Sequence, residues 1–271
     1  MVRMARNALP PGHANPLSRE AVVLVVLAKS PAPGVSKTRL GASIGEDAAA
    51  ALAEAFLDDT LGLAACAGVP LRIAYTPLSA GPGFAGKAPD AVLESQPEGD
   101  LGARISTALE SALAVSNSAV LIGTDTPHLP HAMLHEAFEA LRSASMVLGP
   151  ARDGGFYLIG LREPGITADL FAAVEWSTAS VLETVLANAV RLGISVATLP
   201  EITDIDDLES LEAALAAARR LGTAPRTLAA AEVPGSETVQ RFDRRSGRAN
   251  KEACSPVLDR FPNATGNEAA V

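Results

Sequence analysis

Three basic side chains follow the most apolar stretch of the chain. Residues 22–27, VVLVVL, read as a strand buried on both faces, as in the centre of a parallel sheet. Lys29 follows at once, and Lys37, Thr38 and Arg39 come after two prolines and a glycine. Open α/β sheets bind ligands at the carboxyl ends of such strands. In a chain of net charge −9, this loop predicts an anionic ligand, a phosphate chain, with each charge contact worth about 4 kcal/mol before desolvation.

The loop differs from the common phosphate loops. A Walker A loop, G-x-x-x-x-G-K-[ST], has glycine where this chain has Pro31 and Ser36. A dinucleotide fingerprint needs three glycines, and the loop holds only Gly34. P-loop ATPases and Rossmann dehydrogenases are therefore disfavoured. The alternative to phosphate binding is that Lys37 and Arg39 are solvated charges on an ordinary surface loop.

Carboxylates follow the later predicted strands. Asp125, Asp153 and Asp204 each come directly after a strand, and Asp206 lies two residues further on. Because the carboxyl ends of parallel strands share one sheet edge, these side chains are expected near Lys29 and its loop. Carboxylates beside phosphates bind Mg²⁺ or Mn²⁺, so Asp125, Asp204 and Asp206 are the predicted metal ligands. The alternative is that they cap the helices that follow.

Two further motifs suit an acceptor or a sugar. In Asp153-Gly154-Gly155 the glycines would let a sugar or acceptor approach the backbone while Asp153 faces it; a plain hairpin turn is the alternative. Trp176, the one tryptophan, is either a platform for a sugar ring or a core anchor. His131 and His135 have helical i, i+4 spacing but no H-E-x-x-H motif, so zinc is disfavoured. No G-x-S-x-G elbow supports a serine hydrolase.

Strands and helices alternate along the chain. This pattern predicts an α/β fold with a parallel or mixed sheet covered on both faces. The expected strands are 22–27, 70–76, 91–95, 118–123, 145–151, 156–161 and 194–199. The expected helices are 45–68, 101–115, 130–143, 177–193 and 204–221, and 81–89 is expected to be a surface loop.

Composition and patterning divide the chain and exclude several classes. We expect a flexible leader at 1–20, one domain at 21–222 and a disordered tail at 223–271. The pI of about 5.0 and the 4% aromatic content argue against nucleic acid as a partner. No apolar run reaches the length of a membrane span. The two cysteines have no CxxC neighbour, so no disulfide framework or structural zinc site is implied. The leader has no apolar core, so a soluble, cytoplasmic protein is expected.

Six blocks of this sequence resemble one family in order. They are AKSPAPGVSKTRL, QPEGDLGAR, GTDTPHL, LGPARDGGFYLIGL, EWST and DIDDLESL, between residues 22 and 215. They are similar to the DUF2064 family, whose members are described as radical-SAM/selenodomain-associated transferases or arsenosugar-associated glycosyltransferases. The resemblance implies a three-layer, Rossmann-like GT-A fold with a mostly parallel mixed sheet. The first block is also similar to phospholactate guanylyltransferases, which move a nucleotidyl group.

The resemblance implies roles for individual residues. Lys29, Lys37 and Arg39 would hold nucleotide phosphates, and Gln96 and Arg104 would contact the nucleoside. Asp125 would stand where GT-A enzymes have their metal-binding D-x-D. Position 127 is proline, however, so Asp204 or Asp206 would have to complete the metal site.

The leading hypothesis is a glycosyltransferase that uses a nucleotide-activated sugar, Mg²⁺ or Mn²⁺ and a small-molecule acceptor. Asp153 is the candidate base for the acceptor hydroxyl if the reaction inverts. The second hypothesis is a nucleotidyltransferase, in which a phosphorylated acceptor attacks the α-phosphate of an NTP. The third is a non-catalytic nucleotide-binding module. The oligomeric state is left open.

Overall fold

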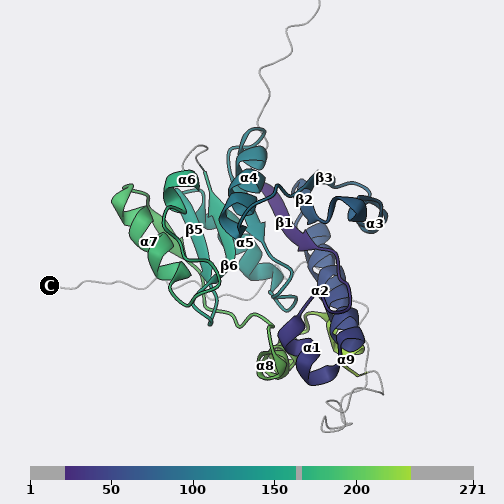
Figure 1. The fold of residues 1–271 in the computed structure, drawn as a ribbon. Coiled ribbons are helices and arrows are strands. Elements are labelled where there is room, and N and C mark those ends of the chain that lie inside the picture. Colours follow the sequence, from purple (N-terminus) through teal and green to yellow (C-terminus); the bar gives the residue numbers. More distant parts are fainter. Residues whose placement is uncertain (1–21, 163–166, 233–271) are drawn as a thin grey trace, which may run out of the picture.

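A computed structural model describes residues 22–162 and 167–232, which contain a mixed seven-stranded sheet (Figure 1). Its order is β3-β2-β1-β4-β6-β5-β7, and β6 is antiparallel to both of its neighbours while every other pair is parallel. The strands are β1 (Val23–Lys29), β2 (Leu71–Thr76), β3 (Val92–Ser95), β4 (Ala119–Ile122), β5 (Met146–Pro150), β6 (Phe156–Leu161) and β7 (Val196–Thr198). The predicted mostly parallel sheet is confirmed.

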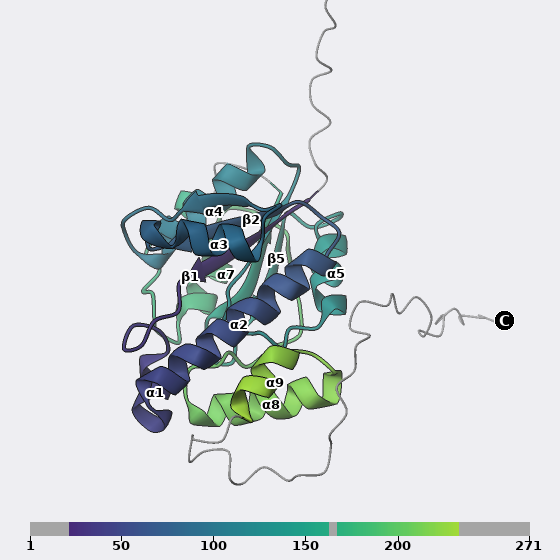
Figure 2. The ribbon, with the colours of Figure 1, turned by 90° about the vertical axis from the view of Figure 1, so that its right-hand side faces the viewer.

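Helices cover both faces of the sheet and give it three layers. One face packs against α2 (Glu46–Cys66), α3 (Gly81–Lys87) and α5 (His131–Ala140). The other packs against α4 (Leu101–Leu113), α6 (Thr167–Leu170) and α7 (Val181–Arg191). Figure 2 shows α2 running diagonally across its face of the sheet. The α/β/α class is therefore confirmed.

The central strand is apolar throughout because both of its faces are covered. Leu24 and Val26 belong to the core beneath α2, whereas Val23 and Val25 belong to the core beneath α4. All four are at most 2% exposed. The alternation of side chains along a strand thus gives one apolar run two cores to fill.

A third core lies between α2 and three further helices. These are α1 (Thr38–Ile44), α8 (Leu208–Leu221) and α9 (Pro225–Ala231). In Figure 2, α1 lies at one end of α2, and α8 and α9 lie below it. Ile205, in the segment that leads into α8, is fully buried there. The buried Asp59 on α2 accepts hydrogen bonds from the backbone N–H groups of Arg226 (3.1 Å) and Thr227 (2.7 Å). A carboxylate at a helix N-terminus satisfies free donors and the helix dipole.

Two predictions of irregular structure are wrong. Residues 81–89 were expected to form a loop, but Gly81–Lys87 is helical because Phe84 is buried against the ring of Tyr75, with centroids 5.3 Å apart. The disordered tail was predicted to begin at residue 223, but Pro225–Ala231 forms the helix α9, in which Thr227 is only 1% exposed. The leader at 1–20 and residues 233–271 lie outside the described residues. No helix of the described part is long and apolar enough to cross a membrane.

Candidate active site

The predicted phosphate loop and the first predicted metal ligand meet where the sheet reverses its strand order. From β1 the chain proceeds to β2 and β3 on one side, whereas β4 pairs with β1 on the other. Lys37 follows β1 and Asp125 follows β4, and Lys37 Nζ lies 2.7 Å from Asp125 Oδ1. Ligands of open α/β sheets bind at such switch points.

Lys37 is the best-enclosed charge of this region. Its side chain is 9% exposed, and its backbone is left-handed, with φ 51° at the residue before α1. Besides Asp125, its ammonium contacts Asp206 Oδ1 at 3.3 Å and donates to the carbonyl oxygen of Ile205. The backbone N–H of Ile205 donates to the carbonyl oxygen of Asp125 at 2.9 Å. Lys37 therefore joins the segments that follow β1, β4 and β7.

The other predicted phosphate ligands are more open. Thr38 is exposed at the start of α1. Arg39 is 76% exposed, with Nη1 3.7 Å from Asp206 Oδ2. Lys29, exposed at the end of β1, donates to the carbonyl oxygen of Val35 at 3.1 Å. Lys37 and Arg39 thus both contact the carboxylate of Asp206, while Lys29 forms a hydrogen bond within its own loop.

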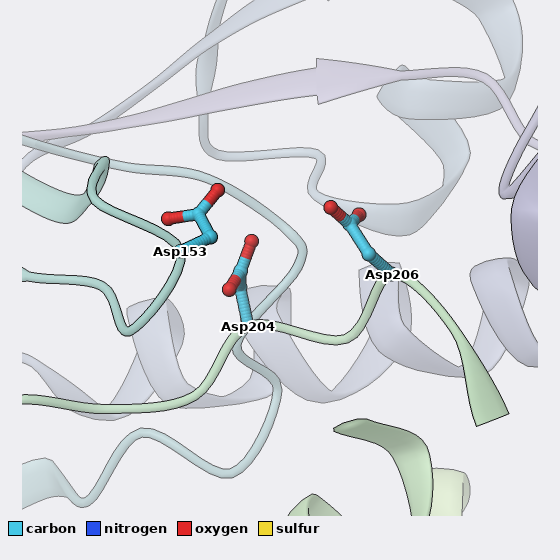
Figure 3. A group of neighbouring side chains, drawn as sticks. All are labelled: Asp153, Asp204 and Asp206. Atoms are coloured by element: carbon cyan, nitrogen blue, oxygen red, sulfur yellow. The ribbon is translucent and has the colours of Figure 1, made fainter. Parts of the chain in front are cut away.

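Three carboxylates gather on two other loops (Figure 3). Asp153 lies between β5 and β6, and Asp204 and Asp206 follow β7. One carboxylate oxygen of each lies within 4.8 Å of the other two. A backbone bond from Ile202 N–H to the carbonyl oxygen of Pro150 (3.1 Å) ties the two loops together. We name these three residues the acidic group.

Mutual repulsion and burial act most strongly on Asp204. Burial, with Asp153 and Asp206 close by, raises the pKa of Asp204 to about 6. Asp206 is half-buried, while Asp153 is exposed and its Oδ1 accepts a hydrogen bond from the Gly155 N–H at 2.8 Å. The site therefore concentrates negative charge that its two cationic neighbours do not neutralise.

The donor set of the acidic group fits a divalent cation. Mg²⁺ and Mn²⁺ prefer carboxylate oxygens, and Mg²⁺ takes one or two of them beside phosphate oxygens and water. Asp125 and the acidic group carry four formal negative charges, and the neighbouring Lys37 and Arg39 carry two positive charges. Two negative charges therefore remain. That excess equals the charge of one divalent ion. Asp204 and Asp206 are thus brought together, with Asp153 beside them. Asp125 pairs with Lys37, and a metal role for Asp125 stays a prediction.

Gln96 is engaged by the protein itself. Its side-chain Nε2 donates to the carbonyl oxygens of Ala28 (3.0 Å) and Ala74 (2.8 Å), at the ends of β1 and β2. Both amide hydrogens are therefore used to hold two strands together. Arg104, on α4, has a buried Nε that finds no hydrogen-bond partner among residues 22–162 and 167–232. A nucleoside contact by either residue stays a prediction.

The two motifs assigned to a sugar or acceptor also have contacts within the fold. A Cβ on Gly154, whose φ is +90°, would come within 2.2 Å of the Ala179 carbonyl oxygen. Because Gly154 has no side chain, its turn can pack closely against the loop before α7. Trp176 packs against Phe171, with ring centroids 5.6 Å apart, and closes over Gly102. These contacts are those of a core anchor, and a platform for a sugar ring stays a prediction.

Comparisons with known proteins agree with this architecture. A model of the family described as "Uncharacterized protein conserved in bacteria (DUF2064)" matches residues 60–178. A solved structure of a candidate nucleotide-diphospho-sugar transferase from Desulfovibrio desulfuricans G20 is 31% identical, with 73% of this chain and 87% of that chain covered and a TM-score of 0.69. The chain belongs to the DUF2064 family. No curated protein matches it.

More distant structures align over most of this DUF2064 protein. Rv0371c from Mycobacterium tuberculosis H37Rv is 18% identical, covering 73% of this chain and 98% of that one, with a TM-score of 0.47. The 4-diphosphocytidyl-2C-methyl-D-erythritol synthase from Anaerococcus prevotii DSM 20548 is 10% identical, covering 74% and 99%, with a TM-score of 0.49. At these scores neither match carries weight for function.

Proposed function

We propose that this protein is a transferase that uses a nucleotide, and specifically a glycosyltransferase acting on a nucleotide-activated sugar with a bound Mg²⁺ or Mn²⁺. The observation that carries the proposal is the meeting of Lys37 with carboxylates from two other loops at the switch point of the sheet. The 31% identical relative, a candidate nucleotide-diphospho-sugar transferase, supports the same substrate class.

Each charged residue has a part in this proposal. Asp204 and Asp206 would hold the cation, which when bound would supply positive charge to the departing diphosphate. Lys37 and Arg39, both within 4 Å of Asp206, would stabilise the same developing negative charge. Lys29 and Thr38 would line the phosphate side of the loop.

Asp153 is the proposed base for the acceptor hydroxyl. It is the exposed member of the acidic group, and the Gly155 N–H holds Oδ1 at 2.8 Å, so Oδ2 stays available for a proton. A carboxylate that orients a hydroxyl and takes its proton must lie within hydrogen-bond reach of it. Gly155, beside Asp153 in the turn, would border the acceptor.

The second candidate is a nucleotidyltransferase. Two cationic side chains on one loop suit a triphosphate as well as a diphosphate, and the first block of sequence resembles phospholactate guanylyltransferases. In this reaction a phosphorylated acceptor attacks the α-phosphate of an NTP and pyrophosphate leaves. A non-catalytic nucleotide-binding module is the third candidate, and it predicts binding without turnover.

One ligand panel separates these candidates. The melting temperature of the protein is measured with Mg²⁺ and each of the common NTPs, UDP-sugars and GDP-sugars. Each compound that raises the melting temperature is then incubated with the protein, and the release of a nucleoside diphosphate or of pyrophosphate is measured. A glycosyltransferase is stabilised by a sugar nucleotide and slowly hydrolyses it to the diphosphate. Stabilisation by GTP or CTP, but by no sugar nucleotide, would overturn the leading proposal. The matched variant is Asp206→Asn, which keeps the shape of the site and should abolish metal-dependent turnover.

A further inference from the structure

The ammonium of Lys37 lies against three oxygen atoms of the protein itself. An ammonium group has three N–H donors. Lys37 donates two hydrogen bonds, to Asp206 Oδ1 at 3.3 Å and to the Ile205 carbonyl oxygen, and its ammonium also forms an ion pair with Asp125 Oδ1 at 2.7 Å. Its side chain is 9% exposed. To come close to a phosphate, this enclosed ammonium has to move away from one or more of these oxygens.

Asp206 belongs to two arrangements at once. It is a partner of Lys37 and also a member of the acidic group, with one of its oxygens within 4.8 Å of those of Asp153 and Asp204. A divalent ion held by Asp204 and Asp206 would lie a few ångströms from the ammonium of Lys37. Two cations so close repel each other, so the ion and Lys37 compete for Asp206.

We propose that Lys37 is a resident cation of the ligand-free site, and that divalent metal and the donor phosphates bind cooperatively because they exchange this residue. In the ligand-free protein Lys37 neutralises Asp125 and Asp206. When a divalent cation binds the acidic group, Lys37 gives up Asp206 and its donor becomes available to a phosphate. This inference rests on the proposed function, because it takes the acidic group as the metal site.

The backbone of Lys37 suits such an exchange. Its left-handed conformation, with φ 51°, is one that a non-glycine residue keeps only where its surroundings hold it there. The three side-chain contacts supply that hold in the ligand-free protein. Loss of one contact weakens it, so the ammonium can move together with the first turn of α1.

The first test measures Mn²⁺ binding without nucleotide, from the electron paramagnetic resonance signal of the free ion. Lys37→Met removes the resident cation, and we expect it to tighten Mn²⁺ binding about tenfold, the effect of one charge near a divalent ion in water-like surroundings. Lys37→Arg keeps the charge and should leave the affinity within about twofold of wild type. Arg39→Met is the matched control: it removes the same charge, 3.7 Å from Asp206 but 76% exposed, and should change the affinity only about twofold.

The second test uses the wild-type chain and does not depend on the folding of a variant. Lysines are acetylated with a limiting reagent and each site is quantified by mass spectrometry. Lys37 should be protected in metal-free protein, react faster with Mn²⁺, and be protected again when pyrophosphate is added. Lys87, paired with Glu54 (2.6 Å) and Asp58 (2.5 Å) on the α2–α3 side, is the internal control and should not change.

The outcomes separate this inference from the proposed function. If wild type binds Mn²⁺ but Lys37→Met does not tighten it, or if Mn²⁺ leaves the reactivity of Lys37 unchanged, the exchange is wrong and the metal site stands. If wild type binds no Mn²⁺, both proposals are overturned. Tighter binding in Lys37→Met together with metal-dependent exposure of Lys37 supports the exchange.

Discussion

Replacing Asp204 by asparagine should stabilise the metal-free protein. The pKa of Asp204 is raised from 3.8 to about 6 by burial and by the charges of Asp153 and Asp206. A difference of that size is worth about 3 kcal/mol, and because Asp204 is only half-buried, solvent screening reduces it to about 1–2 kcal/mol. Asparagine has the same shape without the charge. For a domain of this size we expect the melting temperature to rise by about 3–6 °C.

The stabilisation should depend on pH with a defined sign. Because the pKa of Asp204 is raised on folding, the folded protein holds this proton more tightly than the unfolded chain does. The ionised carboxylate therefore destabilises the fold above about pH 6, and this penalty disappears as the pH falls towards 3.8. Asp204→Asn should thus be more stable than wild type at pH 7.5 and nearly equal to it near pH 4.

The assay is urea unfolding in EDTA at both pH values, with Asp125→Asn as the matched control. The control makes the same chemical change, but Asp125 neutralises the buried Lys37 at 2.7 Å. Losing that charge should lower the free energy of unfolding by about 1–2 kcal/mol, discounted because Asp125 is half exposed. If Asp204→Asn is no more stable than wild type at pH 7.5, the crowding of charge in the acidic group is refuted.

Three further predictions test the site and its support. Mn²⁺ affinity should fall about tenfold between pH 7 and pH 5, since Asp204 must be ionised to bind metal; a flat titration would contradict this. Asp59→Ala should cost about 2–4 kcal/mol in urea unfolding, because two N–H groups of α9 lose a charged acceptor, and a loss below 1 kcal/mol would contradict it. Gly154→Ala should lower the melting temperature by several degrees through its clash with Ala179, and an unchanged melt would show that the turn can shift.

The strand pattern made the location of the site predictable. Once the strands are parallel, Lys37, Asp125 and Asp204 must approach one edge, and the structure brings Lys37 within 2.7 Å of Asp125. The pairing of Asp125 with Lys37, and the place of Asp153 beside Asp204 and Asp206, were not predictable, because side-chain pairing depends on which loops cross. The backbone hydrogen bonds from Ile205 to Asp125 and from Ile202 to Pro150 fix how these loops lie together. They join residues far apart in the sequence, so no local pattern predicts them.

The errors in the fold have a similar cause. The stretch at 81–89 has three glycines and two prolines, so local preference favours a loop, but the burial of Phe84 against Tyr75 overrides it. Residues 225–231 lack a long apolar face, and their helix is fixed by Asp59, which is distant in sequence. The two hydrogen bonds that the Gln96 side chain donates also depend on tertiary structure, since their acceptors lie on β1 and β2.

The most direct test of the central claim is a crystal of the protein soaked with Mn²⁺ and a nucleoside diphosphate, with the metal located by its anomalous signal. We expect one Mn²⁺ peak at Asp204 and Asp206, with the diphosphate between that ion and the side chains of Lys37 and Arg39. A peak at another place, such as the His131–His135 pair with its nitrogens 3.2 Å apart, and a diphosphate away from the loop after β1 would contradict it.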